Sequence, residues 1–63
     1  MNGVTYLSPK QAAERLRLSE KTLERWRSQG SGPRYLKFGT RVRYRADDLD
    51  AWAEKHARFS TSM

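Results

Sequence analysis

Two helix-start signals stand close together in the segment LSPKQAAERLRLSEKTLERWRSQG, residues 7–30. Ser8 can cap a first helix, Pro9 has the backbone angle that a first turn needs, and Gln11 completes a capping box with Ser8. Ser19 can cap a second helix in the same way. Because only two residues separate the first helical pattern from the second cap, the two helices must cross at a steep angle. This spacing predicts a helix-turn-helix.

The apolar spacing sets the expected bounds of the two helices. We expect the first over about residues 9–16 and the second over about residues 20–29. The residues expected to face inward are Ala12, Ala13, Leu16, Thr22, Leu23 and Trp26. Leu18 and Leu23 can form a hydrophobic staple, and Gly30 supplies the positive φ that often ends a helix.

The chain beyond the second helix has the pattern of a β-hairpin. Two alternating runs rich in aromatic and β-branched residues, 35–38 and 41–44, flank the turn Gly39-Thr40. Val42 and Tyr44 share one face of the second run, which can therefore cover a core. The other face carries the cations Arg41, Arg43 and Arg45. A hairpin directly after a helix-turn-helix is a wing.

The two ends of the chain complete the expected organisation. Residues 1–6 are expected to form an extended lead-in, and a final helix is expected over about residues 47–57. Its inward-facing residues are expected to be Leu49, Trp52 and Ala53. Residues 58–63 show no pattern and are expected to be a flexible tail. The predicted fold is mainly α with a small β-hairpin: one winged helix-turn-helix domain at residues 1–57.

Charge is distributed unevenly along the chain, whose formal net charge is +6. Residues 10–45 hold eleven Lys or Arg against three Glu, whereas residues 46–63 hold two basic against four acidic residues. A cationic body beside an acidic final helix favours a polyanion bound on one side. Together with the helix-turn-helix spacing, this indicates double-stranded DNA, with the second helix in the major groove.

Composition argues against several other classes of protein. The chain has no Cys, so disulfides and thiolate zinc ligands are excluded. No apolar run approaches the roughly 20 residues of a membrane span, and no signal-peptide pattern is present, so we expect a cytoplasmic protein without membrane contacts. His56 has no partners at ligand spacing, and the chain shows no catalytic set or phosphate-binding loop. We therefore expect no enzymatic activity, no cofactor and no metal site.

Two segments, YLSPKQAAERLRLSEKTLERWRSQG and PRYLKFGTRVRYRADDLDAW, cover most of the chain. In these segments the chain resembles the small winged-helix excisionases (recombination directionality factors) of phages and integrative elements. It is also similar to AlpA-type prophage activators and, more distantly, to the DNA-binding domains of mercury-resistance-type regulators. It departs from the resemblance at Ala46, where Ser or Thr commonly caps the final helix, and at Glu20 and Glu24 in the expected recognition helix.

The candidate DNA contacts fall into three groups. The exposed face of the second helix is expected to read the major groove with Glu20, Lys21, Glu24, Arg25 and Ser28. The wing tip is expected to enter the minor groove with Gly39, Thr40 and Arg41. The candidate contacts to the DNA backbone are Ser8, Lys10, Thr22, Arg27, Arg34, Lys37, Arg43 and Arg45.

Several individual roles stay open at this stage. Lys21 and Arg25 can read guanine O6 and N7, or clamp phosphates if the helix sits higher in the groove. Glu20 and Glu24 can accept a hydrogen bond from cytosine N4 or orient a neighbouring Arg. A merely solvated face is less favoured, because like charges at i,i+4 destabilise an isolated helix. Tyr35 can touch the DNA backbone.

The resemblance to excisionases implies binding at repeated sites, DNA bending and assistance to a partner integrase. A transcriptional regulator of a prophage or mobile element is the alternative, because it needs the same groove-reading domain. An RNA-binding or protein-interaction module is disfavoured, because the shallow minor groove of RNA gives a recognition helix little to enter. No heptad run is long enough to pair two copies, so we expect a monomer in free solution that binds direct repeats cooperatively.

Overall fold

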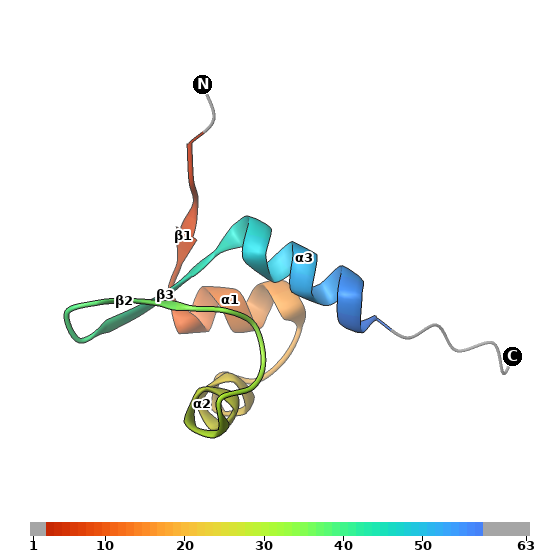
Figure 1. Ribbon diagram of the computed structural model, residues 1–63, viewed down its shortest axis with the longest axis horizontal. Coiled ribbons are helices and arrows are strands. Elements are labelled where there is room, and N and C mark those ends of the chain that lie inside the picture. Colours follow the sequence, from red (N-terminus) through yellow and green to blue (C-terminus); the bar gives the residue numbers. More distant parts are fainter. Residues whose placement is uncertain (1–2, 58–63) are drawn as a thin grey trace, which may run out of the picture.

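The computed structural model describes residues 3–57, and Figure 1 shows how its elements are arranged. In chain order these are β1 (Tyr6–Leu7), α1 (Pro9–Leu16), α2 (Glu20–Gln29), β2 (Leu36–Phe38), β3 (Arg41–Arg45) and α3 (Ala46–His56). Three helices with an antiparallel hairpin placed after a helix-turn-helix make a winged helix-turn-helix, as the sequence predicts. The expected tail at 58–63 and the first two residues lie outside the described part.

Both helix starts form as their capping residues predict. The Ser8 side chain accepts from the Gln11 N–H at 3.1 Å, and the Gln11 amide oxygen accepts from the Ser8 N–H at 2.9 Å. The Ser19 side chain accepts from the Thr22 N–H at the start of α2. These reciprocal bonds satisfy backbone donors that a helix leaves free in its first turn. The expected bounds of α1 and α2 are confirmed.

The turn between α1 and α2 depends on a left-handed residue that the sequence pattern does not mark. Arg17 has φ 59° and ψ 41°, and its backbone N–H bonds back to the end of α1. The Leu18 N–H donates to the Ala13 carbonyl at 2.8 Å, which closes the turn. Leu18 keeps 38% of its surface exposed, while Leu23 is fully buried, so the staple between them stays a prediction.

The sheet has one strand more than the hairpin predicts. β3 lies between β1 and β2 and pairs antiparallel with both. The lead-in is therefore not merely extended: Tyr6 pairs with Arg45, and Leu7 pairs with Tyr44. This pairing extends β3 to Arg45, one residue beyond the expected end. The expected first strand begins one residue late, at Leu36, because its pairing with β3 starts there.

The final helix begins and ends one residue earlier than expected, because β3 runs directly into it. The Ala46 N–H donates to the Thr5 carbonyl at 3.0 Å, so the lead-in also holds the start of α3. Arg45 occupies the N-cap position and makes no side-chain cap bond. The weaker cap that Ala46 leads us to expect is thus present, one position earlier in the chain.

The core lies where α1, α2, α3 and β3 meet. Its buried side chains are Ala12, Ala13, Leu23, Tyr44 and Leu49, with Leu7, Leu16, Trp26 and Val42 packed around them. Small alanines on α1 allow the other elements to approach closely. Trp26 and Trp52 are half-buried, with ring centroids 5.3 Å apart, so the two aromatic residues connect α2 to α3. Trp26 packs against the buried core, as expected, whereas Trp52 is half-buried against Trp26 at the edge of that core.

An exposed ion pair joins α1 to α3. The Arg15 guanidinium donates two hydrogen bonds to the Asp50 carboxylate, at 3.0 and 2.9 Å. The hydrogen bond from Arg15, with its charge, lowers the pKa of Asp50 from its ordinary 3.8. A carboxylate with a lowered pKa stabilises the fold above that ordinary value and loses this contribution as pH falls through its folded pKa.

We therefore expect the melting temperature of Asp50→Asn to fall less than that of the wild type as the pH is lowered below about 4. Arg15→Gln should have the same effect, and the double variant should add little to either single one. Thermal melts at a series of pH values measure this. An unchanged acid limb in Asp50→Asn would contradict the assignment.

Candidate nucleic-acid interface

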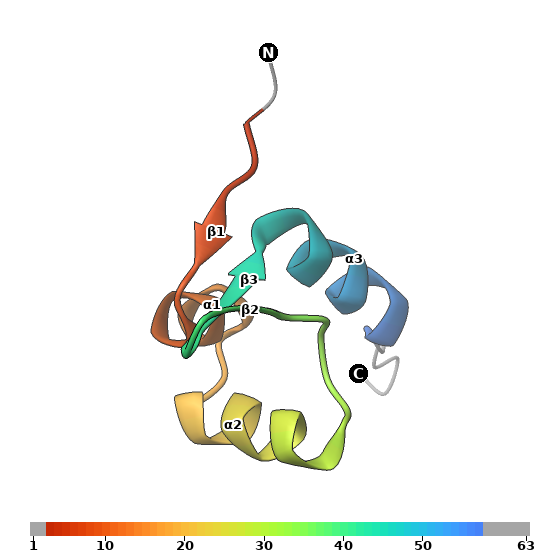
Figure 2. The ribbon, with the colours of Figure 1, turned by 60° about the vertical axis from the view of Figure 1, so that its left-hand side comes forward.

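α2 lies along one side of the molecule with a continuous polar face turned outward. Figure 2 shows α2 across the bottom, with α1 and the strands above it. All five expected major-groove residues are exposed: Glu20, Lys21, Glu24, Arg25 and Ser28. The opposite side of the helix buries Leu23 and half-buries Trp26. The helix thus presents one face for packing and another for a ligand.

The wing projects beyond the helices to the left in Figure 1. Its turn residues Gly39 and Thr40, followed by Arg41, are all exposed. Gly39 adopts φ +66°, a conformation that suits glycine in a tight hairpin turn. A narrow, exposed tip of this kind that ends in an arginine has the shape and charge that a minor groove accepts.

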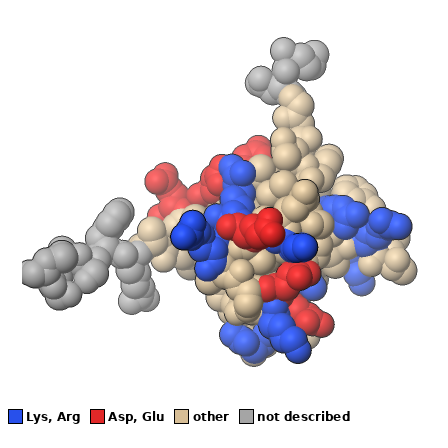
Figure 3. Space-filling model, turned by 180° about the vertical axis from the view of Figure 1, so that it is seen from behind, with Lys and Arg blue, Asp and Glu red and all other residues tan. Residues whose placement is uncertain are grey.

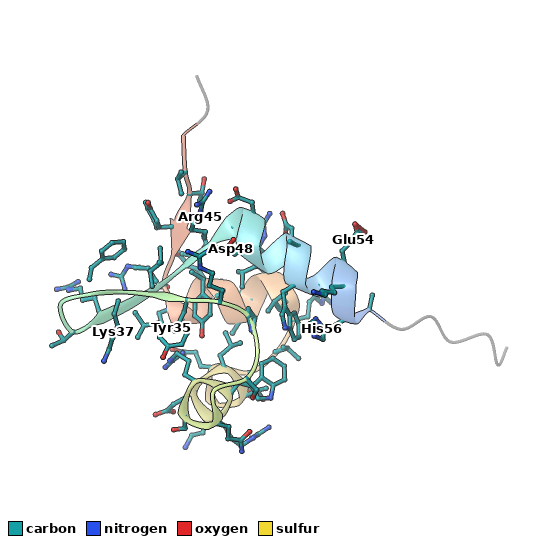
Figure 4. All side chains as sticks on the ribbon, viewed as in Figure 1. Tyr35, Lys37, Arg45, Asp48, Glu54 and His56 are labelled. Carbon is teal, nitrogen blue, oxygen red and sulfur yellow. The ribbon has the colours of Figure 1, made fainter. Side chains whose placement is uncertain are left out.

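The strand register assigns the wing side chains to two faces. Lys37 pairs with Val42, so the two share a face, and Figure 4 shows Lys37 directed toward the side on which α2 lies. Phe38 pairs with Arg41, and Leu36 pairs with Arg43. These two pairs therefore occupy the face directed away from α2.

The sequence pattern predicts a face of cations on the side away from α2. The structure places aromatic side chains there as well. Phe38 is 52% exposed and Tyr6 is 48% exposed, and their rings meet edge to face at 5.5 Å. The contact brings an aromatic residue of β1 beside one of β2, across the central strand. Sequence reasoning missed this because it did not pair the lead-in with the hairpin.

Arg27 faces the wing rather than the solvent. It is half-buried, and its Nη1 donates to the Tyr44 hydroxyl at 2.9 Å. Its guanidinium also lies over the Tyr35 ring, 5.9 Å from the centroid. The rings of Tyr35 and Tyr44 are 6.2 Å apart. Arg27, expected as a backbone contact, is thus held by two tyrosines.

The other residues expected to contact the DNA backbone differ in whether their side chains already form hydrogen bonds within the fold. Lys10, Arg34 and Lys37 are exposed, with no side-chain hydrogen bond among the described residues. Four others already bond within the fold. These are Ser8 at the cap of α1, Thr22 with the Ser19 hydroxyl at 2.9 Å, Arg43 with the Val42 carbonyl at 2.7 Å, and Arg45 with Asp47 at 3.0 Å.

The base of the wing holds a second polar cluster. Arg45 donates to Asp47, yet its Nε is buried without a hydrogen-bond partner among the described residues, as is one carboxylate oxygen of Asp48. Figure 4 shows Arg45 and Asp48 close to the junction of β3 and α3. Both lie where β3 runs into α3, at the opposite end of the strand from the wing tip.

Charged side chains are distributed unevenly over the elements. Figure 3 shows Lys and Arg over the wing and over α2, and also in the middle of this face, where Asp and Glu are mixed with them. The acidic residues of α3 are Asp47, Asp48, Asp50 and Glu54. A polyanion would be attracted to the side that carries α2 and the wing and repelled from the side that carries α3.

Other kinds of site find little support within residues 3–57. No pocket is found there, and no group of three or more His, Cys, Asp or Glu side chains is placed to hold a metal ion. The exposed His56 stacks on Trp52 at 4.6 Å, and its Nδ1 lies 2.9 Å from the Trp52 carbonyl oxygen. No helix in the described part has the length and apolar character that a membrane crossing requires.

Comparison with known proteins agrees with this geometry. The family model described as a helix-turn-helix domain matches residues 6–57, well over half of the chain. That family includes excisionase-like small DNA-binding proteins. No curated protein matches the chain.

Proposed function

We propose a specific role for this DNA-binding chain, which belongs to the helix-turn-helix domain family. It binds particular sites in double-stranded DNA, with α2 in the major groove and the wing tip in the adjacent minor groove. At those sites it acts as an excisionase of a phage or integrative element. The observation that carries the DNA-binding mode is the exposed polar face of α2 together with an exposed hairpin tip, Gly39 to Arg41, that projects beyond the helices.

The length and chemistry of each side chain on α2 and the wing indicate which part of the DNA it contacts. Lys21 and Arg25 on α2 carry long donors that match guanine O6 and N7, while Glu20 and Glu24 accept from cytosine N4 or orient those cations. Ser28 completes the reading face. At the wing, Gly39 and Thr40 allow close approach to the groove. Arg41 lies directly after this turn, on the same sheet face as Arg43, and supplies the charge at the tip itself.

Backbone contacts fix the register of the domain on the duplex without reading its sequence. Lys10, Arg34 and Lys37 suit this role because their charges are exposed and unpaired among the described residues. The Ser8 hydroxyl accepts a bond from Gln11 and keeps its own proton, which can be donated to a phosphate oxygen. The Thr22 hydroxyl can accept from or donate to the Ser19 hydroxyl, and it can serve a phosphate when Ser19 is the donor. Arg43 and Arg45 lie on the sheet face away from α2. They can contact a phosphate only where the DNA backbone runs along that face of the wing.

The excisionase role rests on the resemblance of the sequence to that group. It predicts that the protein binds direct repeats cooperatively as a monomer, bends them and assists an integrase. A regulator of transcription in a mobile element would use the same two contacts. Footprinting across the attachment and promoter regions next to the gene, with an excision assay in the presence and absence of the protein, separates the two. Protection of the promoter alone, with excision unchanged, would assign the protein to regulation.

Salt dependence tests the extent of the cationic surface. If roughly six phosphates are neutralised, the logarithm of the binding constant should fall against the logarithm of salt concentration with a slope near −5. Lys37→Ala should make the slope shallower by about 1. Lys55→Ala, which removes an exposed cation from α3, is the matched control and should leave it unchanged. Fluorescence anisotropy across a salt series measures the slope, and a wild-type value near −1 would contradict the proposed binding surface.

A further inference from the structure

We infer that Arg27 is a positioning residue that holds the wing at a set orientation relative to α2. It does so through Tyr44, so that the helix and the wing tip reach adjacent grooves together. This inference rests on the proposed function and adds to it a residue that determines specificity without reading a base.

The central contact joins α2 directly to the middle strand of the sheet. Arg27 lies on α2, and its Nη1 donates to the Tyr44 hydroxyl at 2.9 Å. Tyr44 lies on β3 and is 1% exposed, so water has little access to its hydroxyl. A buried hydroxyl that loses its partner is left unsatisfied, which makes this bond costly to break. The bond therefore resists movement of β3 relative to α2.

A second contact restrains the same guanidinium from the other strand of the wing. The Arg27 guanidinium lies 5.9 Å from the centroid of the Tyr35 ring, just before β2. Tyr35 in turn lies beside Tyr44, at 6.2 Å between centroids. A planar guanidinium can stack on one ring while donating to another hydroxyl, which a lysine ammonium cannot do in the same geometry. Arg27 thus touches both sides of the wing where it leaves the core.

Residues 30–35 connect α2 to β2, and their contacts run back to α2 itself. The Ser31 N–H donates to the Trp26 carbonyl at 2.8 Å, and Gly32 lies against Trp26. The bond from Arg27 to Tyr44 is the contact that joins α2 to β3. Two adjacent grooves can be entered together only if the helix and the wing tip keep a suitable separation and angle. A wing that is already held in that orientation loses less conformational freedom on binding.

Arg27 also has enough donors to reach a phosphate as well as Tyr44, so the test must separate the two roles. Tyr44→Phe does this, because it removes only the buried hydroxyl and keeps the ring. Arg27→Gln removes the guanidinium, and the double variant completes a cycle. Arg25→Gln, an exposed arginine on the same helix, is the matched control for loss of charge.

Three duplexes serve as probes. The first is a duplex selected from a randomised library by the wild-type protein, the second is the same duplex cut short before the segment under the wing, and the third has a scrambled sequence. Anisotropy titrations over a salt series are run for each variant. Thermal melts confirm that each variant is folded at the titration temperature.

We expect Tyr44→Phe and Arg27→Gln each to weaken binding to the full selected duplex by roughly threefold to tenfold, with the double variant close to either single one. Binding to the shortened and scrambled duplexes should change by less than twofold, and the salt slope of Tyr44→Phe should equal that of the wild type. Residual dipolar couplings of the free protein should show the hairpin reoriented relative to α2 in both variants. Arg25→Gln should weaken the full and shortened duplexes alike.

Arg27 acts as a phosphate contact, and the inference fails, if Tyr44→Phe binds like the wild type while Arg27→Gln lowers the salt slope by about 1 on every duplex. Unchanged couplings in Tyr44→Phe would overturn it as well. Failure of the proposed function looks different, because the wild type would then show no preference for any selected duplex over the scrambled one.

Discussion

Gly32→Ala is expected to lower the free energy of unfolding by about 2–4 kcal/mol, because two separate penalties act at this position. Gly32 has φ +84°, which side-chain-bearing residues rarely adopt. A Cβ there would lie 2.7 Å from Cε3 and 2.8 Å from Cβ of Trp26. Trp26 cannot easily yield, since its own Cβ is fixed to the backbone of α2. A domain of this size has a total stability of only about 3–9 kcal/mol, so the variant loses a large share of it.

Gly30→Ala is the matched control for that variant. Gly30 has a similar φ of +72°, but nothing lies within 4 Å of the position a Cβ would take. It should therefore cost only about 1 kcal/mol, from the backbone conformation alone. Urea denaturation followed by tryptophan fluorescence compares the two variants. Equal losses at both positions would show that the contact between Gly32 and Trp26 does not restrict the loop.

Arg25→Ala is expected to weaken binding to a selected duplex by about 1–3 kcal/mol, which is roughly fivefold to 150-fold. Arg25 is exposed on α2 and makes no side-chain hydrogen bond among the described residues, so its guanidinium is available to a base edge. Because a bidentate contact to guanine reads one base pair, the variant should lose preference at a single position of the site. Repeating the selection with the variant protein measures this loss directly.

Two outcomes distinguish the possible roles of Arg25. Weakening that is uniform over all duplexes, with a shallower salt slope, would make it a phosphate contact rather than a base reader. Lys55→Ala on α3 controls for the general effect of removing a cation and should change neither affinity nor preference. Since neither Arg25 nor Lys55 is buried, both variants should keep the stability of the wild type.

Much of the candidate site could be predicted because its signals are local. Ser8 and Ser19 mark helix starts whose bonds join residues three positions apart, and the polar face of α2 follows from helical period alone. The hairpin turn at Gly39 is equally local. The predictions that such signals support, the bounds of α1 and α2 and the exposure of the reading face, are confirmed.

Apart from the left-handed turn at Arg17, the predictions that were wrong or incomplete involve partners far apart in the chain. β1 is too short to show a strand pattern. It exists because Leu7 pairs with Tyr44, 37 residues later, and Tyr6 pairs with Arg45. Arg15 could not be matched to Asp50 by period or spacing, because α1 and α3 come together only around the core. The mixed aromatic and cationic face of the wing depends on the register between its strands.

Arg27 shows which features the sequence determines and which depend on the tertiary structure. The sequence by itself determined that this residue lies on the recognition helix, near the edge of the polar face, because helical period depends only on position along the chain. Only the tertiary structure decided that its guanidinium turns toward Tyr44 and Tyr35. The physical reason is that such a bond requires two elements to pack at one particular distance and angle, which the folded core sets and no local pattern encodes.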